Sequence, residues 1–463
     1  MKGLHIFTRD YRLTDNTSLI NLVKKCEKII TIYIFTPEQV INNSYKSDKS
    51  IQFMIESLSD LEESKNSGTL FCFQDNYEKV IEKIIKNNDI EVVSINKDYT
   101  PFAKTREKKI NKICEKNNCQ LICDYDYLLT EPGEILSGDG GVYKKFTPFY
   151  NNALKKVKPF SLQNPLFKNK IMREINKSGI KYVTLKDQFI TLIDPDSQSK
   201  LIGGREEGQK KLLALKNQKD YTKKHNFLNY QTSLLGAYTK YGCISIREVF
   251  NKAIKELGKS SDFVRQLFWR DFYTLLLNEY PHLLGSPLKE KYNKIKWINN
   301  NSFFNSWKIG KTGYPIVDAN MRALNTEGWM HNRGRLIVAS FLIKTLGTDW
   351  LKGEKYFATK LIDYDVAVNN GNWQWVAGTG ADAQPYFRIF NPWTQSENYD
   401  PDATFIKKWI PELEELEPKV IHNWYKYANE EQYKEYAKKY GKPIVDYSDQ
   451  KEKILKIYKS VFA

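Results

Sequence analysis

The stretch NNGNWQWVAGTGADAQPYFRIFNP, residues 369–392, contains side chains suited to binding a flat ligand. It places the amide of Asn369 close to two indoles, Trp373 and Trp375. An isolated tryptophan is usually core, but indoles also stack on flat ligands and bases. An asparagine amide both donates and accepts hydrogen bonds without carrying a charge. Because core segments do not usually mix indoles, amides and glycines, the stretch indicates a binding site.

Further segments of the second half carry polar and aromatic side chains of the same kind. Thr232 and Ser233 are typical of a helix N-terminus, which can also bind phosphate. Arg335 and Asp363 could form an ordinary buried ion pair. The segments are TSLLGAY (232–238), RQLFWRDF (265–272), GWMHNRGRL (328–336), GTDW (347–350) and LIDYDVAVNNGNWQW (361–375).

Composition limits the classes of function. The formal net charge of +16 is compatible with a nucleic-acid partner, but a lysine-rich proteome would explain it equally well. The six cysteines lack a paired CxxC spacing, so we expect reduced thiols and no metal site. No apolar run reaches the length of about 18 residues that a membrane span requires, and no signal peptide is seen. We therefore expect an intracellular protein that does not enter a membrane.

The elements that must position these residues fall into two patterns. Five short apolar runs alternate with helical patterns, for example 49–65 and 101–117, which predicts an α/β domain with a Rossmann-like, doubly wound parallel sheet. No GxGxxG follows the first run, so this domain is not expected to hold a dinucleotide in the usual way. The expected strands are 4–7, 29–35, 69–73, 90–95 and 120–125.

The rest of the chain has a different pattern of apolar residues. From 126 the pattern loosens and contains turn sequences such as EPGEILSGDGGVY, and after GGREEGQKKL (203–212) helical periodicity dominates. The fold class is therefore α/β plus all-α. The predicted domains are an α/β domain at 1–125, an interdomain linker at 126–195 and a large helical domain at 196–463.

Taken together and in this order, the motifs closely resemble the photolyase/cryptochrome family, and within it the class I cyclobutane pyrimidine dimer photolyases. The resemblance runs from FTRDYRLTDN (7–16) to FIKKWIPEL (405–413). It implies an α/β antenna domain and a helical domain that binds FAD non-covalently and contacts DNA. The residues that match FAD-binding positions of the family are Tyr221, Thr232, Ser233, Leu234, Leu235, Gly236, Arg335, Asp363, Asp365 and Asn369, the last facing flavin N5.

The resemblance also implies how the chain would act. Trp373, Trp350 and Trp297 match an electron-transfer chain to the flavin, whereas Trp269 and Trp375 match the pair that sandwiches a flipped-out lesion. Light would excite reduced FAD, an electron would pass to a cyclobutane pyrimidine dimer in damaged DNA, and the ring would split. The other residues matching lesion or DNA contacts are Gln266, Arg270, Asn332, Arg333, Leu336, Arg388 and Gln395. We expect a monomer whose antenna chromophore could be a folate or a deazaflavin, or absent.

Two positions depart from the dimer-photolyase pattern. Gln266 stands where a glutamate is usual, and glutamine there is more typical of (6-4) photolyases and several cryptochromes. Leu336 replaces a frequent methionine. A (6-4) photolyase needs two histidines where Asn332 and Leu336 stand, so that alternative is weaker. A cryptochrome photoreceptor remains the main alternative, although Asn369 and the end of the chain soon after its last helical pattern favour repair.

Overall fold

The computed structural model describes residues 1–64, 69–165, 167 and 169–461. The chain folds into two compact units. Unit 1 comprises Met1–Lys219, Ser233–Pro281 and Ile362–Ala367, and unit 2 comprises Asp220–Thr232, His282–Leu361 and Val368–Ala463. Each unit is therefore assembled from segments that lie far apart in the sequence.

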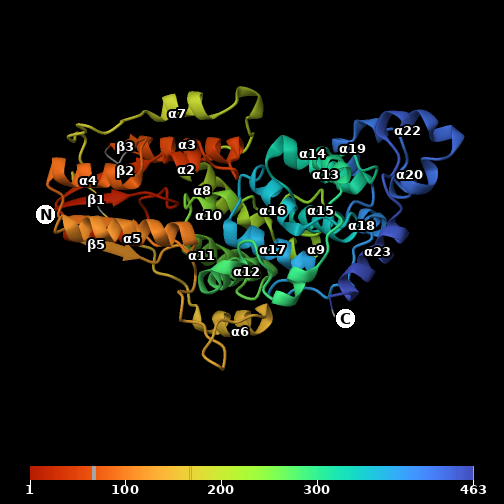
Figure 1. Cartoon of the computed structure of the whole chain (residues 1–463). Coiled ribbons are helices and arrows are strands. Elements are labelled where there is room, and N and C mark those ends of the chain that lie inside the picture. The colour runs from red at the N-terminus through yellow and green to blue at the C-terminus, as the bar shows by residue number, and fades with distance from the viewer. Residues whose placement is uncertain (65–68, 166, 168, 462–463) are drawn as a thin grey trace. The chain divides into compact units, whose positions relative to one another are not determined.

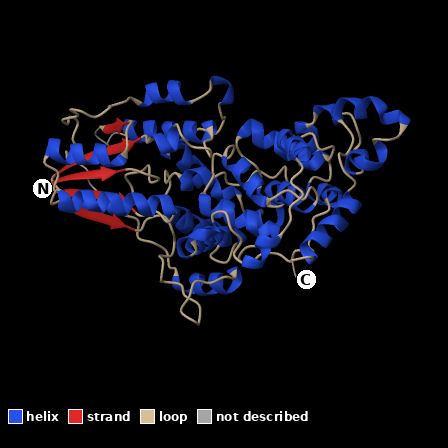
Figure 2. Ribbon diagram, viewed as in Figure 1, coloured by secondary structure: helices blue, strands red, loops and turns tan. Residues whose placement is uncertain are grey.

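The five predicted strands form one parallel sheet in unit 1, with the order β3-β2-β1-β4-β5 (Figures 1 and 2). Leu4 of the central strand pairs with Ile30 on one side and with Val93 on the other. This order is that of a doubly wound, Rossmann-like sheet, so the predicted fold is confirmed. The bounds are β1 Lys2–Ile6, β2 Lys28–Ile34, β3 Leu70–Phe73, β4 Val92–Asn96 and β5 Gln120–Asp124.

The longer helices between these strands begin at polar side chains that cap them. Asn16, Ser47, Asn76 and Thr100 each accept a hydrogen bond from an N–H of the first turn, which satisfies a group that the helix itself leaves unpaired. The predicted helices 49–65 and 101–117 correspond to α3 and α5. The bounds are α1 Thr17–Lys25, α2 Pro37–Val40, α3 Asp48–Glu63, α4 Tyr77–Asn88 and α5 Pro101–Lys116.

The predicted linker, residues 126–195, contains two helices, α6 Phe146–Lys156 and α7 Leu185–Leu192. It also runs beside the sheet, where Ile171 forms an isolated bridge with Ile29 and Tyr182 with Phe73. The sequence did not indicate these helices because they are short and their buried faces pack on elements distant along the chain. The remaining helices of unit 1 are α8 Arg205–Leu213, α10 Gly236–Lys240, α11 Ile246–Leu257 and α12 Asp262–Glu279.

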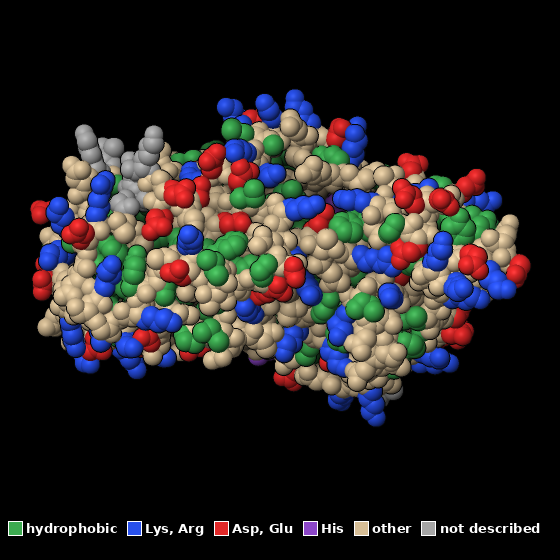
Figure 3. All heavy atoms as spheres, turned by 90° about the horizontal axis from the view of Figure 1, so that it is seen from above, with side chains coloured by type: hydrophobic (Ala, Val, Ile, Leu, Met, Phe, Trp, Pro, Cys, Tyr) green, Lys and Arg blue, Asp and Glu red, His purple; other side chains and the backbone are tan. Residues whose placement is uncertain are grey.

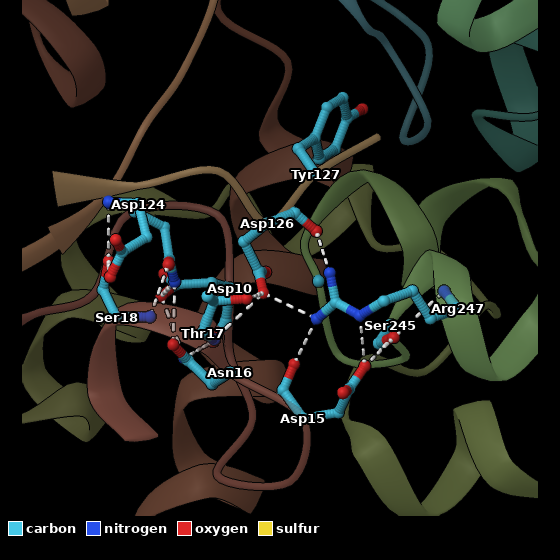
Figure 4. A network of polar contacts seen from close by, with 12 residues as sticks. Asp10, Asp15, Asn16, Thr17, Ser18, Asp124, Asp126, Tyr127, Ser245 and Arg247 are labelled. Carbon is cyan, nitrogen blue, oxygen red and sulfur yellow. Dashed lines mark hydrogen bonds and ion pairs between the residues drawn. The ribbon is translucent and has the colours of Figure 1, made fainter. Parts of the chain in front are cut away.

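A buried charge network connects α11 to the sheet within unit 1 (Figure 4). Asp126, directly after β5, accepts hydrogen bonds from Arg12 Nη2 at 2.5 Å and Arg247 Nη2 at 2.8 Å. Asp15 accepts from Arg247 Nε at 2.7 Å and from the Ser245 hydroxyl at 2.5 Å. Because buried charges must be paired, these bonds help to explain why residues 233–281 belong with the α/β part, across the predicted boundary at 196.

Unit 2 is helical. Its helices are α9 Tyr221–Lys224, α13 Asn301–Ile309, α14 Pro315–Glu327, α15 Asn332–Lys344, α16 Trp350–Ala358, α17 Val366–Ala377 (whose first two residues belong to unit 1), α18 Pro392–Tyr399, α19 Thr404–Trp409, α20 Pro418–His422, α21 Trp424–Tyr427, α22 Lys434–Tyr440 and α23 Tyr447–Lys459. Throughout the described ranges, no helix combines the length and apolarity needed to cross a bilayer. On the face drawn in Figure 3, basic and acidic side chains are interspersed, so the positive net charge does not by itself mark a binding surface.

Candidate flavin and DNA site

Helix α17 gives its two indoles different surroundings. Trp373 is 3% exposed and packs so closely on Gly353 of α16 that a Cβ there would come within 2.2 Å of the ring. Trp375, two residues later, remains partly exposed. One indole thus belongs to the interior of unit 2, whereas the other is accessible to a ligand.

Gln374, between the two indoles, is a structural residue that the sequence did not reveal. Its side chain is 2% exposed, and Nε2 donates to the carbonyls of Leu283 and Ser286 and to Asn370 Oδ1 at 3.0–3.1 Å. Its Oε1 accepts from the Leu288 N–H at 3.3 Å. The amide therefore anchors the loop 283–288 to α17 and fixes the turn that carries Trp373 and Trp375.

Asn369, predicted to face flavin N5, has an amide whose orientation is fixed. Its Nδ2 donates to the carbonyl of Glu354 at 3.2 Å and to Glu354 Oε1 at 2.9 Å. Because a main-chain carbonyl only accepts, the NH2 group must point to α16, which leaves Oδ1 as the acceptor for a ligand N–H. The arrangement suits a protonated N5, as in a reduced flavin.

The three tryptophans of the predicted electron path all lie in unit 2. Trp350 is the first residue of α16, 3% exposed and one turn before the Gly353 on which Trp373 packs. Trp297 is half-buried, with its ring edge-on to Tyr458 at 5.9 Å. A fourth indole, Trp307, is fully buried and edge-on to Trp373 at 6.3 Å, and no sequence motif singled it out.

The N-terminus of α15 exposes Asn332 and partly exposes Arg333. His331 caps this helix, since its Nδ1 accepts from the Arg333 N–H at 3.1 Å, and burial lowers the pKa of His331 to about 4. Arg333 Nη2 donates to Asn226 Oδ1 at 2.7 Å, and its guanidinium lies 4.2 Å from the centroid of the Tyr399 ring. The local sequence thus presents an amide and an oriented cation at a helix N-terminus.

The other predicted residues of unit 2 lie on or near helices. Leu336 and Arg335 are partly exposed on α15, and Arg335 Nε donates to the Met330 carbonyl at 2.9 Å. Tyr221 begins α9, where its ring stacks on His225 at 4.9 Å. Thr232 is partly exposed, Arg388 is exposed, and Gln395 is half-buried on α18.

A buried lysine holds the loop that carries Arg388. Lys344, at the C-terminus of α15, is fully buried, and its Nζ donates to the Arg388 carbonyl at 2.9 Å. Burial, together with the nearby Arg388 guanidinium, lowers the pKa of Lys344 to about 7. Gln384, in the same loop, is 4% exposed, and neither polar atom of its amide has a hydrogen-bond partner within the described part of the chain.

In unit 1, the segment predicted to hold the FAD phosphates leads into α10. Ser233, Leu234 and Leu235 precede Gly236, and Leu234 has a positive φ of 57° while Leu235 is right-handed helical. Such an alternation turns successive N–H groups to one side and binds anions. Gly236 is exposed, and a Cβ there would lie 3.1 Å from an oxygen of the Asp363 carboxylate. These residues fit the diphosphate of a dinucleotide.

Helix α12 carries three predicted lesion or DNA contacts. Gln266 is exposed and Trp269 is partly exposed. Arg270 is held by the protein: Nη1 donates to the Tyr127 carbonyl at 2.6 Å, and the guanidinium lies 3.4 Å from the centroid of the Tyr127 ring. The ring and carbonyl of Tyr127 therefore fix the side chain of Arg270, and its contact with DNA stays a prediction.

Asp365 is similarly held within unit 1. It accepts hydrogen bonds from the Tyr127 hydroxyl at 2.8 Å and from Arg9 Nη2 at 2.7 Å, while Arg9 Nη1 lies 3.2 Å from Asp98. Asp365 thus links the segment after β1 and the predicted linker to the start of α17. The predicted pairing of Arg335, in unit 2, with Asp363, in unit 1, stays a prediction.

Comparison with known proteins covers both halves of the chain. Residues 4–168 match the family model described as DNA photolyase, and residues 263–460 match the FAD binding domain of DNA photolyase. A curated relative from Alkalihalophilus pseudofirmus, named deoxyribodipyrimidine photo-lyase, is 34% identical over 98% of this chain and 97% of its own. The match therefore extends over both proteins almost from end to end.

Solved structures agree with this match. The archaeal photolyase from Sulfolobus tokodaii, described with two FAD molecules, has a TM-score of 0.86 and 38% identity, covering 99% of this chain and 100% of its own. A Synechocystis sp. cryptochrome has a TM-score of 0.89 and 28% identity, covering 98% of this chain and 99% of its own. Because two family models and a near full-length relative agree, the chain belongs to the photolyase/cryptochrome family, with FAD as its cofactor.

Proposed function

We propose that this protein is a light-driven enzyme that splits cyclobutane pyrimidine dimers in DNA. The observation that carries the proposal is the end-to-end match to a curated relative named deoxyribodipyrimidine photo-lyase. The protein would act inside the cell, where the DNA is, and as a monomer. The accessible Trp375 beside the buried Trp373 supports a site that serves two partners, DNA and flavin.

When bound, reduced FAD supplies the photoexcited electron. Asn369 favours the protonated N5 of that state because its NH2 group donates to Glu354, so Oδ1 is the atom that would accept from a ligand N–H. Trp373, Trp350 and Trp297 provide oxidisable rings in unit 2 through which the flavin can be reduced again. The antenna stays open between a folate, a deazaflavin, a second flavin and no chromophore, the second flavin being suggested by the archaeal relative with two FAD molecules.

The lesion would be read by indoles and amides. Trp269 and Trp375 would stack on the extruded bases, and stacking of this kind contributes about 1–3 kcal/mol per base. Gln266 is exposed on α12, so its neutral amide can donate to a lesion carbonyl and stabilise negative charge that develops there. Asn332, exposed at the start of α15, offers a second amide.

A cryptochrome-type photoreceptor is the second candidate. It is favoured by Gln266 and by the similarity to the Synechocystis cryptochrome. The two candidates differ in one measurable property, because a photoreceptor without repair activity leaves the lesion intact.

The deciding experiment is a light-dependent assay with the reduced full-length protein. Defined duplexes carry either one cyclobutane thymine dimer or one (6-4) product, and chromatography of digested DNA measures the restored thymines in light and in darkness. Light-dependent repair of the cyclobutane duplex alone supports the proposal, and Gln266→Glu should retain it. Repair of the (6-4) duplex, or of neither, would overturn the proposal.

A further inference from the structure

Phe146, the first residue of α6, lies directly on the indole of Trp269. The two rings are nearly parallel, with an interplanar angle of 7° and a centroid separation of 3.6 Å. Phe146 is fully buried, whereas Trp269 is partly exposed. Both residues belong to unit 1, although α6 lies in the segment predicted as a linker.

The phenyl ring is itself held on several sides. Tyr150, one turn later in α6, stacks on it at 5.7 Å, and Phe272 of α12 meets it edge-on at 5.7 Å. The guanidinium of Arg265 lies 5.4 Å from its centroid. The ring of Phe149 also lies 6.4 Å from it. A buried ring held by these four neighbours is a rigid support, so the plane of the Trp269 indole is fixed with it.

This stack closes one face of the Trp269 indole to a base, and the ring of Tyr273 lies 5.5 Å from the indole at an interplanar angle of 29°. Layers of carbon atoms in contact are about 3.5–4.0 Å apart. A separation of 3.6 Å between Phe146 and Trp269 therefore has no room for a third ring. Any base that stacks on Trp269 must use the opposite face.

We propose that Phe146 is a positioning residue for lesion recognition and acts through Trp269; the proposal rests on the proposed function. A stacking platform binds better when its ring is already oriented, because ordering the side chain then opposes binding less. Helix α6 would thus be part of the lesion-recognition apparatus rather than a connection between domains. The partner is an extruded pyrimidine pair, whose flat rings would stack on the face of the indole that Phe146 does not cover.

The test compares Phe146→Leu with Phe149→Leu. Phe149 is a matched control: it is 1% exposed, lies in the same helix, packs on Phe272 at 5.6 Å and meets Phe146 only at 6.4 Å in a tilted arrangement. Within the described residues, its ring makes no stacking or edge contact with Trp269. Kd is measured at one salt concentration for intact and dimer-containing duplexes, and bound FAD is measured by absorbance.

We expect Phe146→Leu to lower the preference for damaged DNA by about five- to tenfold, part of what stacking contributes. Binding of intact DNA and FAD content should stay at wild-type values, and Phe149→Leu should change the preference less than twofold. In a Trp269→Ala background, Phe146→Leu should have no further effect on preference, because the support has lost the ring on which it acts. If Phe146→Leu loses FAD, Phe146→Met replaces it as the better-filling variant.

Equal changes in preference for the Phe146 and Phe149 variants would overturn the inference, as would a further loss in the Trp269→Ala background. A wild-type protein with no preference for dimer-containing DNA would contradict the proposed function itself. A wild type that prefers the dimer, with an unaffected Phe146 variant, would contradict only the role of Phe146.

Discussion

Two groups of buried polar side chains differ in how many of their polar atoms have a hydrogen-bond partner in the protein. In unit 1, the charge network consists of Arg12, Asp15, Asp126, Ser245 and Arg247, and both of its carboxylates accept several hydrogen bonds. Among the fully buried side-chain atoms of these residues, within the described part of the chain, Arg12 Nε alone lacks a partner. In unit 2, the second group of buried polar side chains lies on and near α15, α18 and the loop before α18. Within the described ranges, buried atoms without partners occur there at His331 Nε2, Arg333 Nε, Gln395 Oε1 and both polar atoms of Gln384.

We interpret this difference as one between residues that hold the fold and residues that are predicted to face DNA. A buried polar atom without a partner destabilises a protein by about 1–3 kcal/mol, so such atoms are rare unless they have a function. The charge network contributes to stability, whereas the second group lies where DNA contacts were predicted. Substitutions in the two groups should therefore affect different measurements.

The largest effect is expected in the charge network. Asp126→Ala would leave Arg12 and Arg247 without a shared carboxylate, and breaking a buried pair destabilises by about 3–5 kcal/mol. Although burial alone would raise it, these two guanidinium groups hold the pKa of Asp126 well below its ordinary range. Urea denaturation measures the loss. Asp75→Ala, at an exposed pair with Lys79, is the control and should leave the midpoint nearly unchanged; equal losses would contradict the comparison.

Gln374 lies near the site, but its side chain is fully hydrogen-bonded. A substitution there tests whether such a residue stabilises the protein as the charge network does. Gln374→Leu removes four hydrogen bonds and should destabilise by about 1–3 kcal/mol, because it leaves the buried Leu283 carbonyl and the part-buried Ser286 carbonyl without this partner. Thermal unfolding followed by circular dichroism measures this. Asn372→Ala, half-buried in the same helix, should cost clearly less. A Gln374 variant of wild-type stability would show that these bonds contribute little.

Replacing Lys344 should stabilise the protein, whereas the two substitutions above should destabilise it. Its pKa falls from about 10.5 when unfolded to about 7 when folded, so the unfolded chain binds more protons between these values. Stability therefore rises with pH in that window, by at most about 1.4 kcal/mol per pH unit from this group. Lys344→Met should raise the melting temperature at pH 6 and flatten the profile from pH 7 to 10. Lys352→Met, on a partly exposed side chain, should leave the slope as it is; a slope that persists in Lys344→Met would refute the assignment.

The smallest effect is expected at Arg333, which should matter for DNA and little for stability. Arg333→Ala should weaken binding of intact and damaged duplexes by the same few-fold factor. It should also reduce the slope of log K against log salt concentration by about the contribution of one phosphate contact. Trp375→Ala should instead remove the preference for damaged DNA. Titrations at several salt concentrations measure both, and an unequal loss in the Arg333 variant would mean that this residue reads the lesion.

The sequence predicted the sheet well because buried parallel strands are continuous apolar runs. It placed the first strand at 4–7, but β1 begins at Lys2, since ladder hydrogen bonds do not require apolar side chains. Helix α6 was not predicted, because FTPFYNNALKK contains a proline and is short, and because its partners lie more than 100 residues later on α12. Packing between distant segments leaves no local periodicity.

For the site, residue types could be predicted but not their surroundings. The motif NNGNWQW indicated a flat ligand, and the family resemblance supplied roles for Asn369, Trp373 and Trp375. The burial of Trp373, the orientation imposed on Asn369 by Glu354 and the anchoring by Gln374 depend on α16 and on the loop 283–288. These interactions join residues whose spacing along the chain carries no signal.

The charge network also has a consequence for the order in which the protein is made. Asp126 leaves the ribosome 121 residues before Arg247, and Arg12 leaves it 230 residues before the Gly242 carbonyl to which it donates. Because synthesis proceeds at about 5–20 residues per second, roughly 6–24 s pass between the synthesis of Asp126 and that of Arg247, its second guanidinium partner. During that time the carboxylate of Asp126 lacks one of its two partners, so we expect the nascent sheet to be most prone to aggregation in this stretch of synthesis.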